Sequence, residues 1–229
     1  MLKLLLTLSL VLGIVGTVRA QAAGGNAAAG PIFEADTREV PELQPWGRAA
    51  EALCVVWYPR IVAILYDGNM PAPPSSVRLY FKKEMDGVAF ADGTKIQIAA
   101  PWIRKSPNDF GMVIHELTHI VQAYPNYDAG WLVEGIADYV RLKFFEPQLP
   151  APKIDFSKAK YTDSYKTTAV FLIRTEEKYD VSLVRKLNAA LKAGKYDDTL
   201  FKTLTGKDLP TLWAEFAAEY GRKDAPVGP

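Results

Sequence analysis

The sequence contains very little cysteine and histidine for its length. Among 229 residues there are one cysteine, Cys54, and two histidines. A single cysteine excludes an intramolecular disulfide, and its apolar neighbours favour a buried thiol over a nucleophile. A nucleophilic thiol would also need a histidine partner, and both histidines belong to a different motif.

An excess of charge of either sign is also absent. The chain carries 27 Lys and Arg against 26 Asp and Glu, a formal net charge of +1. Loss of residues 1–20 would remove Lys3, Arg19 and no acid, leaving 25 basic against 26 acidic side chains and a charge of −1. This balance predicts no nucleic-acid or polyanion partner.

Long apolar runs are absent except near the N-terminus. Lys3 precedes the apolar stretch from Leu4 to Val15, and Val18-Arg19-Ala20 places small residues where a signal peptidase reads them. A transmembrane anchor is the weaker alternative, because the stretch is shorter than the ~20 residues that span a bilayer. We expect a signal peptide over residues 1–20, cut after Ala20. The mature protein would then be secreted, extracellular or periplasmic, without stable membrane insertion.

The remaining chain has no internal repeat and predicts one domain over residues 41–221. Residues 21–40 begin with small residues and are predicted to be a flexible leader, and residues 222–229 a frayed tail. Three prolines in the loop 147–160 separate an N-lobe (about 41–146) from a helical C-lobe (about 153–221). We expect a monomer with the active-site cleft between the lobes.

The periodicity of apolar residues predicts an α+β fold with a small mixed sheet. A helix is expected over 42–65, kinked or broken at Pro59. A strand over 77–81 and a hairpin over 87–100 follow, with a type I′ turn at Asp92-Gly93. Later helices are predicted at 110–124, 131–145, 165–179, 182–193, 197–204 and 210–220.

The second arm of the hairpin, Lys95 to Ala100, alternates apolar and polar residues. If this arm is the exposed edge of the sheet, an extended peptide can pair with it through main-chain hydrogen bonds. Gln97 and Ala99 are therefore predicted to bind substrate. An ordinary interior strand is the alternative.

The segment His115-Glu116-Leu117-Thr118-His119 is an HExxH motif inside an apolar helix. Histidines four residues apart lie on one helix face, so both imidazoles can bind one Zn²⁺. Glu116 lies beside that face, where it can act as the general base. Two buried histidines without a metal are the alternative, at a high desolvation cost.

A third ligand is needed, and it must come from a carboxylate. The position six residues after His119, where one class of zinc peptidases has a histidine, is Pro125. The nearby acids are Asp128, Glu134, Asp138 and Glu146. Glu134 and Asp138 share a helix face, so one can bind zinc while the other supports a ligand histidine. Three protein ligands leave a position for water, which is typical of a catalytic site.

The segments VIHELTHIVQAYP and GWLVEGIADYVRLK resemble the plant basic secretory protein family of peptidases and its bacterial relatives. These are gluzincin-type zinc peptidases, and the resemblance extends over roughly residues 40–220. It implies that Glu134 is the third ligand and that Asp138 hydrogen-bonds His115. It also implies one zinc ion per chain and a peptide or protein substrate. The formal charge of −1 departs from the "basic" in the family name.

Zinc peptidases of this class commonly add a histidine or tyrosine donor for the oxyanion. No third histidine exists here, so Tyr165 or Tyr161, at the start of the C-lobe, is predicted to take this role; packing of both rings is the alternative. Arg141 and Arg174 are further candidates. The sequence thus predicts a secreted zinc-dependent peptidase, and the alternative is a zinc-binding defence or binding module with little catalytic activity.

Overall fold

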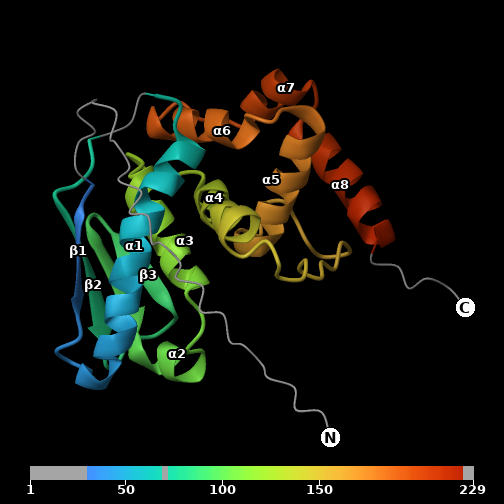
Figure 1. Cartoon of the computed structure of the whole chain (residues 1–229). Helices are drawn as coiled ribbons and strands as arrows, with labels where there is room; N and C mark the ends of the chain where they lie inside the picture. Colours follow the sequence, from blue (N-terminus) through green and yellow to red (C-terminus); the bar gives the residue numbers. More distant parts are fainter. Residues whose placement is uncertain (1–29, 69–71, 224–229) are drawn as a thin grey trace, which may run out of the picture.

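The computed structural model describes residues 30–68 and 72–223. The predicted signal peptide, the first part of the predicted leader and residues 224–229 lie outside this range. Within it, no helix has the length and apolar character needed to cross a membrane. The fold is α+β, with a four-stranded mixed sheet and a C-terminal part that is mostly helical, as the sequence predicted (Figure 1).

The sheet consists of β1 (Ile32–Asp36), β2 (Ser76–Lys82), β3 (Ala89–Asp92) and β4 (Lys95–Ala99) in the order β1-β2-β4-β3. β2 pairs in parallel with both β1 and β4, whereas β3 pairs antiparallel with β4. One face of the sheet is apolar because the buried residues alternate along the strands; they are Val77, Leu79, Phe81, Ile96 and Ile98.

The sheet corrects three expectations. Residues 32–36, which were predicted to be leader, form the strand β1. The hairpin loop is Gly93-Thr94, because Asp92 pairs with Lys95, and only Gly93 has positive φ among these residues, so a type I′ turn at Asp92-Gly93 is wrong. β4 lies between β2 and β3 and is therefore not the sheet edge.

Two helices of the N-terminal part pack on the apolar face of the sheet. α1 (Gln44–Leu65), which follows the 3-10 turn η1 (Pro41–Leu43), contacts β1 and β2, and α3 (Gly111–Gln122) contacts β3. The short helix α2 (Ala100–Lys105) directly follows β4 and was not predicted. α1 continues through Pro59 without a break, because Pro59 and the residue four positions before it, Val55, both lie on the solvent side.

The C-terminal part is built around α4 (Gly130–Val140), whose last turn continues as the π-helical segment η2 (Arg141–Phe145). Four further helices follow: α5 (Tyr165–Tyr179), α6 (Leu183–Lys192), α7 (Thr199–Thr205) and α8 (Leu209–Lys223). α4 and α5 share the largest contact between helices. They approach closely at Gly135, where an added Cβ would lie 2.2 Å from Cγ2 of Thr168.

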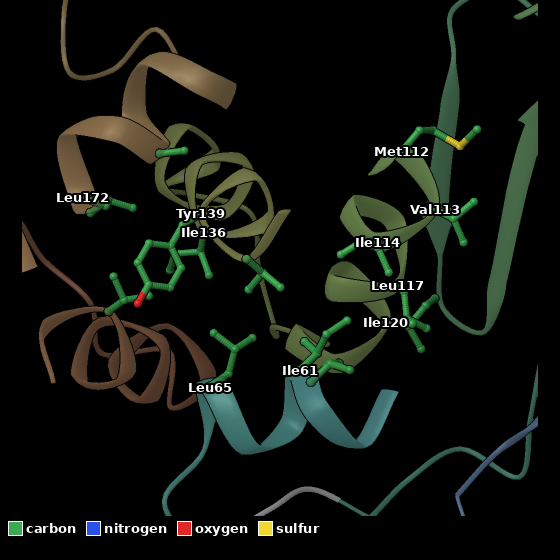
Figure 2. Packing of buried hydrophobic residues seen from close by; sticks show 14 of the residues in the cluster. Ile61, Leu65, Met112, Val113, Ile114, Leu117, Ile120, Ile136, Tyr139 and Leu172 are labelled. Atoms are coloured by element: carbon green, nitrogen blue, oxygen red, sulfur yellow. The ribbon is translucent and has the colours of Figure 1, made fainter. Parts of the chain in front are cut away.

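One apolar core joins the two parts (Figure 2). Ile61 and Leu65 of α1 reach the space between α3 and α4, where Leu117 and Ile136 are also fully buried. Because α3 is covered by the sheet, α1 and α4, its backbone is held rigidly. The motif histidines therefore project from a fixed support.

Candidate active site

The motif helix α3 is capped at both ends by side chains from outside it. At its start, Oδ1 of Asp109 accepts a hydrogen bond from the N–H of Met112 (3.2 Å). At its end, Ala123 adopts a left-handed conformation, and Nζ of Lys192 on α6 donates to its carbonyl (2.6 Å). Such caps satisfy backbone groups that have no partner inside the helix.

His115, His119 and Glu134 form a compact cluster between α3 and α4. One ligand atom from each lies within 4.8 Å of the other two, and this is the group that could hold a metal within the described residues. Oε2 of Glu134 lies 3.0 Å from Nε2 of His115 and 3.4 Å from Nε2 of His119, and the two nitrogens are 3.1 Å apart.

These spacings fit a tetrahedral metal ion. Zn²⁺ with bonds of about 2.0–2.1 Å to each ligand requires ligand atoms roughly 3.3–3.4 Å apart. Two of the observed separations, 3.0 and 3.1 Å, are slightly shorter than this value, and the third, 3.4 Å, matches it. The helices therefore need no rearrangement to bind the ion. Of the other acids considered, Glu146 is ion-paired with Arg141, and Asp128 is exposed in the loop between α3 and α4.

Asp138 holds His115 from the side opposite the cluster. Its Oδ1 lies 2.8 Å from Nδ1 of His115, and both residues are buried. Burial of His115 opposes its charged form, but the carboxylates of Asp138 and Glu134 outweigh this effect and raise its pKa to about 10. Burial likewise opposes the charged form of Glu134, but the two histidines lower its pKa to about 2. A bound metal cation would take the place of the positive charge that the protonated histidine holds beside these carboxylates.

Two residues of this site were missed or misjudged from the sequence. Gln122 is buried, and its Oε1 lies 2.7 Å from Nδ1 of His119. Tyr127 donates its hydroxyl hydrogen to Oε1 of Glu134 from the loop between α3 and α4. The spacing of Gln122, three residues after His119 on the same helix, was the available signal.

Glu116 is 6% exposed and faces the edge strand β3. Burial raises the pKa of its carboxyl group, while the charges of His115 and His119 and the N–H of Ala91 act in the opposite direction. A carboxylate with a raised pKa is suited to take up a proton near neutral pH.

The cluster opens into a cleft of about 1140 Å³. β3 forms one wall, α3 and α4 form the floor, and residues 163–167 at the start of the C-lobe form the other wall. The edge strand presents to this cleft main-chain groups that do not pair with β4. Because Val88 accepts a ladder hydrogen bond from Ala99, alternation leaves the N–H and C=O groups of Ala89 and Ala91 pointing away from β4.

The predicted substrate residues Gln97 and Ala99 do not reach the cleft. Both lie on the interior strand β4; Ala99 is fully buried, and Gln97 lies on the sheet face opposite the buried Ile96 and Ile98. The premise of their assignment to substrate binding, that β4 is the exposed edge, is therefore wrong. The hairpin was identified from the sequence, but its other arm, β3, is the one that lies at the edge.

The two candidate tyrosines occupy different environments. Tyr165 is 55% exposed and lines the cleft, with its ring stacked 5.9 Å from the ring of His115. Tyr161 packs instead in the C-lobe, 5.3 Å from the ring of Trp131 and 6.4 Å from that of Phe171, and does not line the cleft. The ring of Tyr161 is held among aromatic neighbours, which favours the packing alternative for this residue.

The backbone at Tyr165 is unusual. Ser164 and Tyr165 have φ angles of 63° and 46°, a left-handed region that residues with a Cβ rarely adopt. Strain of this kind persists where the surrounding structure enforces it and is concentrated at functional sites. Of the arginines considered, Arg141 lines the cleft but is paired with Asp109 and Glu146, whereas Arg174 is paired with Glu177 on the surface.

The fold and the site together define a class of protein. The HExxH helix and the Glu-xxx-Asp pair on the next helix match the pattern of the gluzincin-type peptidases that the sequence resembles. The chain belongs to the BSP family, the peptidases of plants and bacteria, whose family model matches residues 49–216. This confirms the resemblance found in the sequence. Neither a curated protein nor a solved structure matches the chain.

Proposed function

We propose that this protein is a zinc-dependent peptidase that binds one zinc ion per chain through His115, His119 and Glu134. The observation that carries the proposal is the spacing of the three ligand atoms, 3.0, 3.1 and 3.4 Å, on rigid helices. Two imidazoles and one carboxylate are a ligand set used by catalytic zinc sites, which keep a fourth position open. Membership of a peptidase family supports a peptide or protein substrate.

Bound zinc would polarise the scissile carbonyl and lower the pKa of the attacking water. Glu116 takes the proton from that water and delivers it to the leaving amine. Its burial, which raises the pKa of the carboxyl group, supports both steps. Asp138 fixes the ring of His115 through the 2.8 Å contact with Nδ1.

Tyr165 is the proposed donor to the oxyanion. The negative charge of Glu134, together with partial burial, raises the pKa of its phenol, so the hydroxyl stays protonated and able to donate. Its ring stacks on His115 at the mouth of the cluster. A substrate in extended conformation would pair with the main-chain groups of Ala89 and the carbonyl of Ala91 on β3, while the N–H of Ala91 faces Glu116.

The protein is proposed to act outside the cytoplasm, in the extracellular space or the periplasm. The support is the pattern of residues 1–20, in which Lys3 precedes an apolar stretch and Ala20 ends a small-residue cleavage site. Detection of a mature N-terminus at Gln21 in the exported fraction would test this. An uncleaved N-terminus in that fraction would contradict it.

The decisive experiment is a peptide-library digest read by mass spectrometry, with Glu116→Gln as the matched control. The wild type should cleave, and chelator should stop cleavage that added zinc restores. Glu116→Gln should keep its zinc and its fold but lose nearly all turnover, because an amide cannot accept the proton. Undiminished turnover of the variant would remove Glu116 from the base role. Zinc binding without cleavage by the wild type would favour a non-catalytic binding or defence module.

A further inference from the structure

Gln122 lies at the C-terminal end of α3, three residues after His119, and its side chain has no assigned role. It is 1% exposed, and both ends of its amide are hydrogen-bonded. We infer that Gln122 is a positioning residue that sets the tautomer and orientation of His119 and ties that ligand to the helix carrying Glu134. The inference rests on the proposed role of His119 as a metal ligand.

The orientation of the amide is dictated by the backbone. Nε2 of Gln122 lies 3.1 Å from the carbonyl oxygen of Val133, and a carbonyl can only accept a hydrogen bond. The NH₂ group must therefore face Val133, and Oε1 must face His119. Oε1 is an acceptor, so Nδ1 of His119, at 2.7 Å, must carry the hydrogen. Nε2 of the neutral ring is then left with its lone pair, directed at the cluster.

The same bond couples two metal ligands. Val133 immediately precedes Glu134 on α4, so Gln122 spans from one ligand histidine to the backbone beside the carboxylate ligand. The backbone of Gln122 is itself anchored, since its carbonyl accepts hydrogen bonds from Lys192 on α6 and from Tyr66 after α1. A polar side chain buried between α3 and α4 thus fixes the distance and the angle between the ligands.

Metal affinity separates this role from simple packing. Gln122→Met keeps the length of the side chain but removes both hydrogen bonds. Zinc affinity, measured by competition with a chromophoric chelator, should fall by about 10–100-fold, as for other partners of ligand histidines. Gln97→Met, the same substitution on the sheet face away from the site, should leave affinity unchanged. Wild-type affinity in Gln122→Met would overturn the inference, whatever its thermal stability.

Gln122→Glu distinguishes the contribution of the hydrogen bond to His119 from that of the hydrogen bond to Val133. A carboxylate still accepts from Nδ1 of His119 but has no hydrogen for the carbonyl of Val133. This variant should lose less zinc affinity than Gln122→Met, because the bond to His119 remains and only the tie to α4 is broken. It should also have a lower unfolding midpoint, because a buried carbonyl loses its donor. A loss of affinity as large as in Gln122→Met would show that the bond to His119 is not what matters.

The tautomer can be observed directly because the chain has only two histidines. In untagged protein labelled with ¹⁵N-histidine, the zinc-loaded wild type should show two solvent-protected Nδ1–H signals. Gln122→Met should lose protection of one and keep the other, which belongs to His115 bonded to Asp138. A wild-type spectrum without a protected Nδ1–H on His119 would refute the inference even if the variant does not fold. Absence of zinc binding by the wild type would instead refute the proposed function.

Discussion

Substitution of Gly135 by alanine sets two physical effects against each other. Gly135 lies inside α4, where replacing glycine with alanine normally stabilises a helix by about 0.8–1.0 kcal/mol. The structure predicts the opposite sign. An added Cβ would lie 2.2 Å from Cγ2 and 2.8 Å from Cβ of Thr168, whereas unstrained carbon atoms lie ~3.5–4.0 Å apart.

Thr168 cannot easily move aside. It is fully buried, and its hydroxyl donates to the carbonyl of Tyr161 at 2.7 Å, so rotating the side chain would break that bond. Helices α4 and α5 must therefore separate. Because the added Cβ would overlap Cγ2 of Thr168 by more than ~1 Å, the cost after relaxation lies in the upper part of the usual range for overpacking, about 2–3 kcal/mol. Set against the gain in helix propensity, the free energy of unfolding should fall by about 1–2 kcal/mol.

Urea and thermal unfolding measure this difference, which corresponds to a decrease in Tm of roughly 2–8 °C for a domain of this size. Gly221→Ala is the matched control, because an added Cβ there meets nothing closer than 3.7 Å, and it should be neutral or stabilising. Gly135→Ala combined with Thr168→Ser, which removes Cγ2 but keeps the hydroxyl, should recover part of the loss. If Gly135→Ala were as stable as the wild type or more so, the close packing of α4 on α5 would be refuted.

The remaining predictions concern the site itself. Glu134→Ala should abolish tight zinc binding, and Asp138→Ala should weaken it by about 10–100-fold in a chelator competition; the reverse order would exchange their roles. Tyr165→Phe should reduce turnover by roughly 10²-fold with zinc content unchanged, and Tyr161→Phe should have little effect; equal turnover of Tyr165→Phe and wild type would exclude the donor role. In metal-free protein, the pKa of His115 in the folded state, about 10, exceeds the ordinary value of 6.5. Its contribution to stability is therefore complete below pH 6.5 and lost as the pH rises through 10. Urea unfolding should show this decline relative to His115→Gln, and coincident profiles would contradict it.

The chemistry of the site could be predicted from the sequence because it depends on short-range spacing. Histidines at i and i+4 lie on one helix face whatever surrounds the helix, and the same holds for Glu134 and Asp138. The sequence also limited the third ligand to four acids. Which acid faces the histidines depends on the crossing of α3 and α4, and the structure places Glu134 and Asp138 there.

The strand that borders the cleft could not be predicted from local pattern. The second arm alternates apolar and polar residues, whereas residues 88–91 of the first arm are all apolar, a pattern that does not mark the first arm as the edge. β4 became an interior strand because β2, a distant segment, pairs with it in parallel. That pairing leaves Ala89 and Ala91 on the edge strand beside Glu116 and places Gln97 and Ala99 inside the sheet.

What the sequence by itself determined is therefore the type of each element and the residues that share a helix face, since both follow from backbone geometry over a few residues. The buried side of α1 shows what local backbone geometry does not determine. α1 has apolar residues on more than one side: Ala50 and Cys54 are buried, whereas Ala52 and Val56 are exposed. Only the tertiary structure decided which side meets the sheet, which strand lies at the edge, and that Gln122 is buried against His119, because each depends on segments brought together by folding.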